Sequence, residues 1–417
     1  MKYCLVTFGC RVNQADSFQI EEQLIAAGGT AALANDADLV VINTCSVTGA
    51  ADQSTRQTVR KIARANPGAR IVVTGCYATR RPDEIRGLPG VVQVIPNDRK
   101  QRLAQEIGLT TAERFADGEG ACGAEIAPGL AGRTAYTLRV QTGCDQTCSY
   151  CIIPSTRGSG RSKPVHDVLA EVDRVRRAGY REIALTGVHL GSYGRDLGDK
   201  SSLIGLLEAI AGRTSGVRFR ISSLEPMDCT DAIVDLVAAA PCFAPHFHLP
   251  LQHASDRILV AMRRPYTLAY YRRLLDRIRA GIPHASIGSD AIVGFPAETD
   301  GDFQVLEAYL ASSPLTHVHV FPYSDRPGTA AAALGDKVHG SIVRERAHVL
   351  REVSRELNRT FHRAQSGTVR HGLTIDDGSV VVTDNYLKVR IPPGLSRNEW
   401  VSVAISEQDG TLVGAIV

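Results

Sequence analysis

Residues 135–151 read AYTLRVQTGCDQTCSYC, a run that alternates like a β-strand and then places three cysteines within eight positions. The strand should carry Cys144, Cys148 and Cys151 into one short loop at its carboxyl end. A structural zinc site would want a fourth protein ligand and usually takes cysteines in C-x-x-C pairs. This loop supplies three thiolates, and three ligands on a four-iron cluster leave one iron open to a small molecule. The spacing therefore favours an iron-sulfur cluster over zinc.

The residues after this loop repeat a strand and a helix about six times. The strand-like runs lie at 136–142, 182–188, 218–224, 246–252, 286–295 and 317–324. Six units fall short of the eight that close a full (β/α) barrel. We therefore predict that residues 134–365 form an open (β/α)6 partial barrel, with the three cysteines at its active face and an open side for a bulky substrate.

The two ends of the chain show different patterns. In residues 1–110, β-branched runs at 39–45, 71–76 and 91–95 alternate with helical stretches, which predicts a parallel α/β domain. Residues 111–133 are rich in glycine, alanine and acidic residues without a period, which is typical of a linker. Residues 366–417 combine turn signals with short strands and predict a small β-barrel.

A second set of cysteines follows the strands of the N-terminal domain. Cys10, Cys45 and Cys76 each lie just past a predicted strand, at separations of 35 and 31 residues that match successive βαβ units. Open parallel sheets bind ligands beyond the carboxyl ends of their strands, so all three should meet at one edge. Glycine precedes Cys10 and Cys76, where the backbone can bend toward a ligand. The alternative is three buried, inert cysteines.

Composition limits the class of protein. A chain of 417 residues is long enough for two or three domains, and 44% hydrophobic with 22% charged residues is ordinary globular usage. The chain has no apolar run long enough to span a bilayer and no signal-peptide pattern, so we expect no membrane contact and a cytoplasmic location. Ten cysteines would stay reduced there, which favours metal binding over disulfides. The near balance of 47 basic and 44 acidic residues gives no global argument for nucleic acid.

The motifs resemble those of a known family. CDQTCSYC resembles the cluster signature of radical S-adenosylmethionine enzymes, and the chain from residue 3 onward resembles the methylthiotransferases of that superfamily. The motifs that carry this resemblance are FGCRVNQADS, INTCSVT, TGCYA, LTGVHLGSYG, LPLQHASD, AIVGFPAET and FPYSDRPGT. LTGVHLGSYG, INTCSVTGAADQSTRQ and MRRPYT most resemble the branch that modifies threonylcarbamoyladenosine in transfer RNA. The last 50 or so residues resemble the family's RNA-binding TRAM module.

The resemblance implies two 4Fe-4S clusters and S-adenosylmethionine. Cys144, Cys148 and Cys151 would hold the cluster that chelates and cleaves S-adenosylmethionine to a 5′-deoxyadenosyl radical. Cys10, Cys45 and Cys76 would hold an auxiliary cluster that carries the sulfur. The product would bear a methylthio group on C2 of N6-threonylcarbamoyladenosine next to the anticodon. The partners would be a tRNA anticodon stem-loop, a reducing electron donor and a sulfur donor that the sequence does not identify.

The resemblance also suggests weaker site residues, and no catalytic residue beyond the cluster ligands. Tyr150 would lie against the adenine of S-adenosylmethionine, or simply pack under the loop. Gly294 could let the backbone approach the cofactor, and Gln252 would face the same rim. The family more often has Ser-Gly-Ser after that glutamine and Gly-Glu-Thr after Phe-Pro, where this chain has His253, Ala254 and Ala297.

Three further features have open interpretations. RRPYTLAYYRRLLDRIR at 263–279 fits either an RNA-gripping surface or an amphipathic helix with a solvated arginine face. The histidines of HFHLPLQH and HVHVF alternate on strands and are interpreted as core or rim residues rather than ligands. Cys4, Cys122, Cys229 and Cys242 fit no cluster pattern. The alternatives to tRNA modification are methylthiolation of a ribosomal protein side chain and a non-enzymatic protein that binds metal and RNA.

Overall fold

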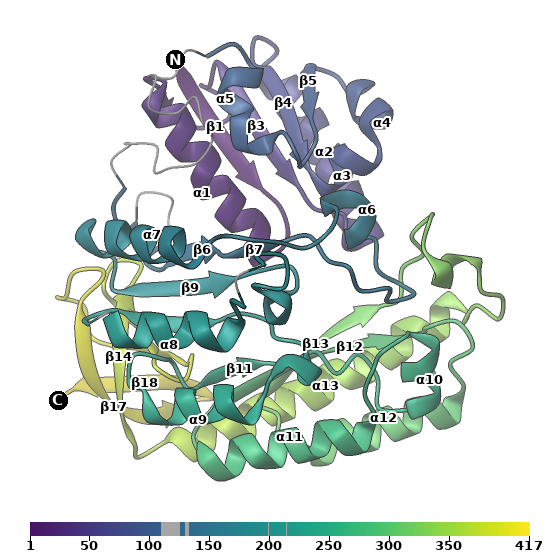
Figure 1. Cartoon of the computed structure of the whole chain (residues 1–417), viewed down its shortest axis with the longest axis vertical. Coiled ribbons are helices and arrows are strands. Elements are labelled where there is room, and N and C mark those ends of the chain that lie inside the picture. Colours follow the sequence, from purple (N-terminus) through teal and green to yellow (C-terminus); the bar gives the residue numbers. More distant parts are fainter. Residues whose placement is uncertain (110–125, 130–132, 199, 214) are drawn as a thin grey trace.

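The computed structural model describes residues 1–109, 126–129, 133–198, 200–213 and 215–417 (Figure 1). Cys122 and most of the predicted linker at 111–133 lie outside these described residues. Figure 1 shows the N-terminal sheet packed over the central strands, with the C-terminal barrel, in yellow, beside one end of them.

The N-terminal part is a three-layer α/β structure. Its sheet is parallel throughout, in the order β2-β1-β3-β4-β5. β3 is buried along its whole length because helices cover both faces of the sheet. Ile20 and Leu24 pack on one face, and Val59 and Ile62 on the other. The elements are β1 Lys2–Thr7, α1 Arg11–Ala26, β2 Thr30–Ala31, β3 Leu39–Thr44, α2 Gly49–Ala65, β4 Arg70–Gly75, α3 Cys76–Arg80, α4 Pro82–Arg86, β5 Val91–Ile95, η1 Lys100–Arg102 and α5 Leu103–Glu106.

The central part has six parallel strands in chain order. They form two three-stranded sheets, β6-β9-β10 and β11-β12-β13, which a bridge between Phe219 and Phe243 connects. Among the described strands β6 and β13 do not pair, so the barrel is open and the predicted fold is confirmed. The strands are β6 Tyr136–Arg139, β9 Glu182–Thr186, β10 Arg218–Ile221, β11 His246–His248, β12 Ser286–Val293 and β13 His317–Pro322, with a small hairpin of β7 Gln141–Thr142 and β8 Arg161–Ser162.

Helices cover the outside of these strands. Their apolar residues recur at helical spacing, as with Val168, Val172 and Val175 on α7, and form one core with the strands. The helices are α6 Ile153–Arg157, α7 Val165–Arg177, α8 Leu203–Arg213, α9 Asp231–Ala239, α10 Asp256–Ala261, α11 Leu268–Gly281, α12 Asp300–Ser312 and α13 Gly340–Gln365, with short 3-10 turns η3 Leu190–Ser192, η4 Pro226–Asp228 and η5 Ala330–Ala333.

The arginine- and tyrosine-rich segment at 263–279 includes most of α11. Within α11 the buried residues are Tyr271, Leu274, Leu275 and Ile278, one stripe at helical spacing. The Tyr271 hydroxyl donates to the Leu249 carbonyl oxygen at 2.8 Å. Arg277, on the exposed side, pairs with Asp235. The structure therefore favours the amphipathic-helix interpretation over base stacking by these tyrosines.

The C-terminal part is a closed five-stranded barrel, which confirms the predicted β-barrel. Its order is β14-β15-β16-β18-β17, and Val381, Val389 and Val403 fill its interior. The sequence reading missed β14, since Gly372 interrupts its apolar alternation. The strands are β14 Val369–Ile375, β15 Val380–Thr383, β16 Lys388–Arg390, β17 Trp400–Gln408 and β18 Thr411–Ile416. No helix in the described part of the chain has the length and apolar character needed to cross a membrane.

Candidate active site

The N-terminal cysteines meet at one edge of the sheet. Cys10 follows β1 and is the N-cap of α1, Cys45 directly follows β3, and Cys76 is the first residue of α3 after β4. β1, β3 and β4 are neighbours in the sheet, so their carboxyl ends share an edge. The strand order reverses between β1 and β3, the kind of crevice in which open α/β sheets bind ligands.

Two glycines allow the cysteines to approach. Gly9 has φ +88°, and a Cβ there would collide with the Cys45 side chain. Gly75 has φ +100°, and a Cβ there would collide with the backbone of Thr44, the residue before Cys45. Both glycines precede a cysteine of the set, so each lets its neighbour pack close to Cys45.

Buried charges make this edge electropositive. The carboxylate of Asp16 accepts from Lys100 Nζ at 2.9 Å and Arg157 Nη2 at 3.0 Å, and also pairs with Arg139. Burial alone would raise its pKa, but these three cations hold the pKa of Asp16 well below its usual range. Three buried cations thus share one carboxylate. The excess positive charge suits thiolates or another anionic group.

The thiols respond to this environment differently. Burial raises the pKa of Cys45 to about 11, and the charges of Cys10 and Cys76 add to the shift. Burial also acts on Cys76, but Arg157 and Lys100 outweigh it and lower the pKa of that thiol. The lowered pKa of Cys76 therefore favours the thiolate form, which a metal ligand needs.

The second trio lies in the loop that follows β7. Backbone hydrogen bonds fold this loop, from Cys144 N to Gly158 O at 3.0 Å and from Cys151 N to Cys148 O at 3.1 Å. Burial raises the pKa of Cys148 and raises that of Cys151 to about 12. A bound metal would offset this penalty because coordination deprotonates a thiol outright.

Two polar side chains contact this second trio. Arg264 Nη1 donates to Cys148 Sγ at 3.1 Å, and Arg264 also pairs with Glu225. His189 Nε2 lies 2.7 Å from Asp228 Oδ2. Burial opposes the imidazolium form, but hydrogen bonds to Asp228 and Cys144 raise the pKa of His189 to about 9. Both side chains place positive charge beside the cysteines.

The two trios are physically connected. Asn97 Nδ2 donates to Cys76 Sγ at 3.6 Å and to the Thr156 carbonyl oxygen at 2.8 Å. Thr156 belongs to α6, which begins two residues after Cys151. Arg157, also on α6, donates to Asn13 Oδ1 at 2.6 Å and interacts electrostatically with Cys76 and Cys10. The N-terminal edge therefore lies against the barrel loop.

The other predicted site residues have clear structural surroundings. Tyr150 packs against the apolar cluster that contains Ile258, Met262 and Phe295. Gln252 has φ +68°, and its backbone amide donates to the Asp290 carbonyl oxygen at 2.8 Å, so it lies beside β12. Contact of Tyr150 and Gln252 with a cofactor stays a prediction.

Packing in the fold explains why position 294 is a glycine. Its φ is +74°, and a Cβ would collide with Val343 of α13. Its amide donates to Glu298 Oε2 at 2.8 Å. Packing against α13 is therefore enough to require glycine here, and approach of a cofactor to this backbone stays a prediction.

Sequence reasoning missed four residues that contact the cysteines: Asn97, Arg157, His189 and Arg264. Asn97 follows β5 as the cysteines follow their strands, and this strand-end position was the available signal. His189 and Arg264 lie inside motifs quoted for the family resemblance, and Arg157 lies six residues after Cys151, but only the folded chain shows which of these side chains reach the cysteines.

Two family models and several known proteins match this chain. Residues 2–96 match the uncharacterized protein family UPF0004, and residues 138–310 match the radical SAM superfamily. The chain is 34% identical to the threonylcarbamoyladenosine tRNA methylthiotransferase MtaB of Bacillus subtilis, over 92% of this chain and 88% of that protein. It is 36% identical to a tRNA-2-methylthio-N(6)-dimethylallyladenosine synthase of a Parafrankia species, over 88% of this chain and 76% of that protein.

A solved structure shares the fold. The radical S-adenosylmethionine methyltransferase TsrM of Kitasatospora setae, with cobalamin and a 4Fe-4S cluster bound, superposes with a TM-score of 0.56 and 15% identity. The match covers 79% of this chain and 77% of that one. At this identity the likeness concerns the architecture alone.

Proposed function

Because the chain belongs to the methylthiotransferase family of radical S-adenosylmethionine enzymes, we propose that it places a methylthio group on C2 of N6-threonylcarbamoyladenosine, next to the anticodon of tRNA. The observation that carries the proposal is that Asn97 connects the N-terminal trio with the helix that follows the second trio. Asn97 donates to Cys76 and to the Thr156 carbonyl oxygen of α6, which supports a site that uses both sets of thiols.

The residues fit two clusters of the same kind. Cys144, Cys148 and Cys151 would hold one, and Cys10, Cys45 and Cys76 the other. With three ligands each, such clusters supply one-electron cleavage of S-adenosylmethionine at one site and a place for sulfur at the other. The buried positive charge beside the N-terminal trio supports this assignment.

The chain's own side chains hold and shield these sites. Arg264 and His189 place positive charge beside Cys148 and Cys144, which stabilises thiolates in a partly buried loop. Arg157 does the same for Cys76. Ile152 and Met262 are buried near the loop and help to exclude water, which a reactive carbon radical requires.

The RNA partner would be the anticodon stem-loop of tRNA, in the cytoplasm. Arg218 and Arg220 of β10 attach the C-terminal barrel to the central strands, and Arg220 donates to the Thr383 carbonyl oxygen at 2.7 Å. A fixed module of this kind can orient RNA toward the cysteines. A reducing electron donor and a sulfur donor complete the proposed partners.

Nucleoside mass spectrometry of tRNA from a deletion strain tests the proposal. We expect threonylcarbamoyladenosine to lose its methylthio group in the deletion strain and to regain it with the wild-type gene. Cys45→Ala and Cys148→Ala should fail to restore it, and Cys242→Ala, a thiol in neither trio, should restore it. Iron should fall from roughly eight per chain to about four in each of the first two variants.

Three outcomes would contradict the proposal. One is a methylthio group that persists on the threonylcarbamoyl nucleoside in the deletion strain. Another is loss from dimethylallyladenosine instead, the substrate in the name of the Parafrankia relative. The third is unchanged tRNA with an altered mass of a ribosomal protein, which would favour a protein side chain as substrate.

A further inference from the structure

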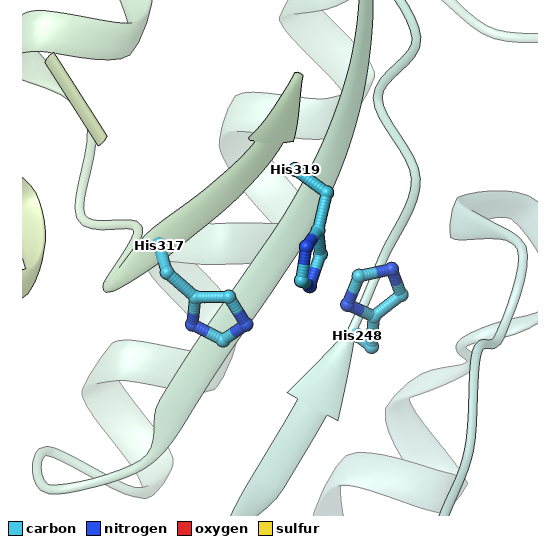
Figure 2. Close-up of side chains that lie close together, drawn as sticks. All are labelled: His248, His317 and His319. Atoms are coloured by element: carbon cyan, nitrogen blue, oxygen red, sulfur yellow. The ribbon is translucent and has the colours of Figure 1, made fainter. Parts of the chain in front are cut away.

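Three histidines of the central strands come together on one sheet face (Figure 2). His248 ends β11, and His317 and His319 lie on β13. The residues that alternate with them, Phe247 and Val318, belong to the core under the outer helices. Successive side chains of a strand point to opposite faces, so the three histidines face the inside of the open barrel. One ring nitrogen from each lies within 4.8 Å of the others.

A glycine makes this approach possible. His248 and His317 are the cross-strand partners of Gly288, which lies on β12 between them. A Cβ at Gly288 would lie closer than 3.0 Å to both His317 Nε2 and His248 Nδ1. Glycine therefore leaves the space over β12 in which these two nitrogens converge.

Neighbouring polar groups orient the same two nitrogens. His248 Nε2 lies 3.0 Å from Asp290 Oδ1, so the carboxylate accepts the Nε2 proton and leaves a lone pair on Nδ1. Thr316 Oγ1 donates to the Ile287 carbonyl oxygen at 3.1 Å and lies 3.0 Å from His317 Nδ1. The hydroxyl then accepts the Nδ1 proton of His317, which leaves the lone pair on Nε2.

We propose that His248, His317 and His319 bind one divalent transition-metal ion of the zinc class, separate from the cysteine sites. Imidazoles suit zinc, whereas sets of thiolates also select iron-sulfur clusters. Three histidines leave a fourth position open for water or another oxygen ligand. His319 is exposed, so the open position faces solvent inside the barrel. Carboxylate–histidine pairs such as Asp290 with His248 commonly support such ligands.

Zinc chloride added to the full-length chain tests the site. The cysteines are first filled by anaerobic reconstitution with iron and sulfide, and unbound zinc is removed by gel filtration. We expect elemental analysis to find one zinc per chain. X-ray absorption at the zinc edge should show only nitrogen or oxygen neighbours, at about 2.0–2.1 Å.

Two variants with one control assign the ligands. His317→Gln removes a ligand, and Gly288→Ala adds a methyl group against two donor nitrogens. Gly288 does not adopt a left-handed backbone, so alanine is compatible with its conformation. We expect each variant to weaken zinc binding at least about 10-fold. His166→Gln, which removes an exposed histidine on α7, should bind zinc as the wild type does.

The result is clear in either direction. Sulfur neighbours at about 2.3 Å would place the zinc on cysteines and overturn the proposal. Equal zinc binding by wild type, His317→Gln and Gly288→Ala would do the same. Should His317→Gln not fold, judged by its iron content and circular dichroism, Gly288→Ala decides the matter alone.

Discussion

At the scale of single residues, two alanines lie where the family resemblance predicts glycine, and they differ in backbone conformation. Ala297 has φ +63°, in the left-handed region, and its amide donates to the Asp336 carbonyl oxygen at 2.9 Å. Ala254 is buried and does not have a positive φ. A left-handed alanine costs roughly 1–2 kcal/mol. Only one of the two replacements therefore strains the chain.

We predict opposite effects for glycine at these two positions. Ala297→Gly should raise the free energy of unfolding by about 0.5–1 kcal/mol, because relief of strain exceeds the added chain entropy. Ala254→Gly, its matched control, should lower it by about 0.4–1 kcal/mol. Urea unfolding of cluster-loaded protein measures both. The account of Ala297 fails if the two variants shift stability in the same direction.

At the scale of elements, α12 depends on a capping box at its N-terminus. Asp302 Oδ2 accepts from the Thr299 amide at 2.9 Å and from its hydroxyl at 2.6 Å, while Ser255 Oγ donates to Asp302 Oδ1 at 2.6 Å. Although burial alone would raise it, these bonds and Arg257 hold the pKa of Asp302 well below its usual range. Because the pKa is lower in the folded state, ionised Asp302 stabilises the protein above about pH 4, the pKa of an unfolded aspartate. This stabilisation is lost as the pH falls through the folded-state pKa.

Asp302→Ala should therefore destabilise the protein by about 1–3 kcal/mol, through loss of the cap and of buried hydrogen bonds. The loss should be constant between pH 5 and 8, because both pKa values lie below this window. Urea unfolding at several pH values measures it. Gln304→Ala, on the exposed side of the same helix, should cost less than about 0.5 kcal/mol. A loss that varies across the window would show that another group titrates with Asp302.

At the scale of the whole molecule, one carboxylate connects two parts of the chain. Asp16 on α1 pairs with Lys100 in the N-terminal part and with Arg139 and Arg157 in the central part. Asp16→Asn keeps the shape but leaves three buried cations without a counter-charge. Removing one partner of a buried ion pair costs about 3–5 kcal/mol. We predict a lower melting temperature and faster hydrogen exchange in α1 and β6.

The exposed Asp36 offers a matched control for this change. Asp36→Asn should leave the melting temperature and the exchange rates near those of the wild type, because such a surface change alters the free energy of unfolding by less than about 0.5 kcal/mol. Unchanged exchange in β6 of Asp16→Asn would mean that apolar packing, rather than this ion network, holds the N-terminal sheet to the barrel.

The sequence by itself determined the order of most strands along the chain and the positions of the cysteines that follow them. Periods of two and of about 3.6 residues, with glycine at the turns, are local properties, so the α/β layer, the open barrel and the C-terminal barrel could all be read from it. The spacing of Cys144, Cys148 and Cys151 is equally local. Strand-end positions also placed Cys10, Cys45 and Cys76 at one edge.

The tertiary structure alone decided which distant residues meet. Asn97 reaches Cys76 and α6 at once, and His248 joins His317 across Gly288, although the two histidines are far apart along the chain. Alternating histidines therefore suggested core or rim residues, because nothing local shows a register between strands. The left-handed backbone of Ala297 was hidden for the same reason. Cross-strand register and helix packing depend on the whole fold, and a one-residue shift of register would turn His248 or His317 to the opposite face.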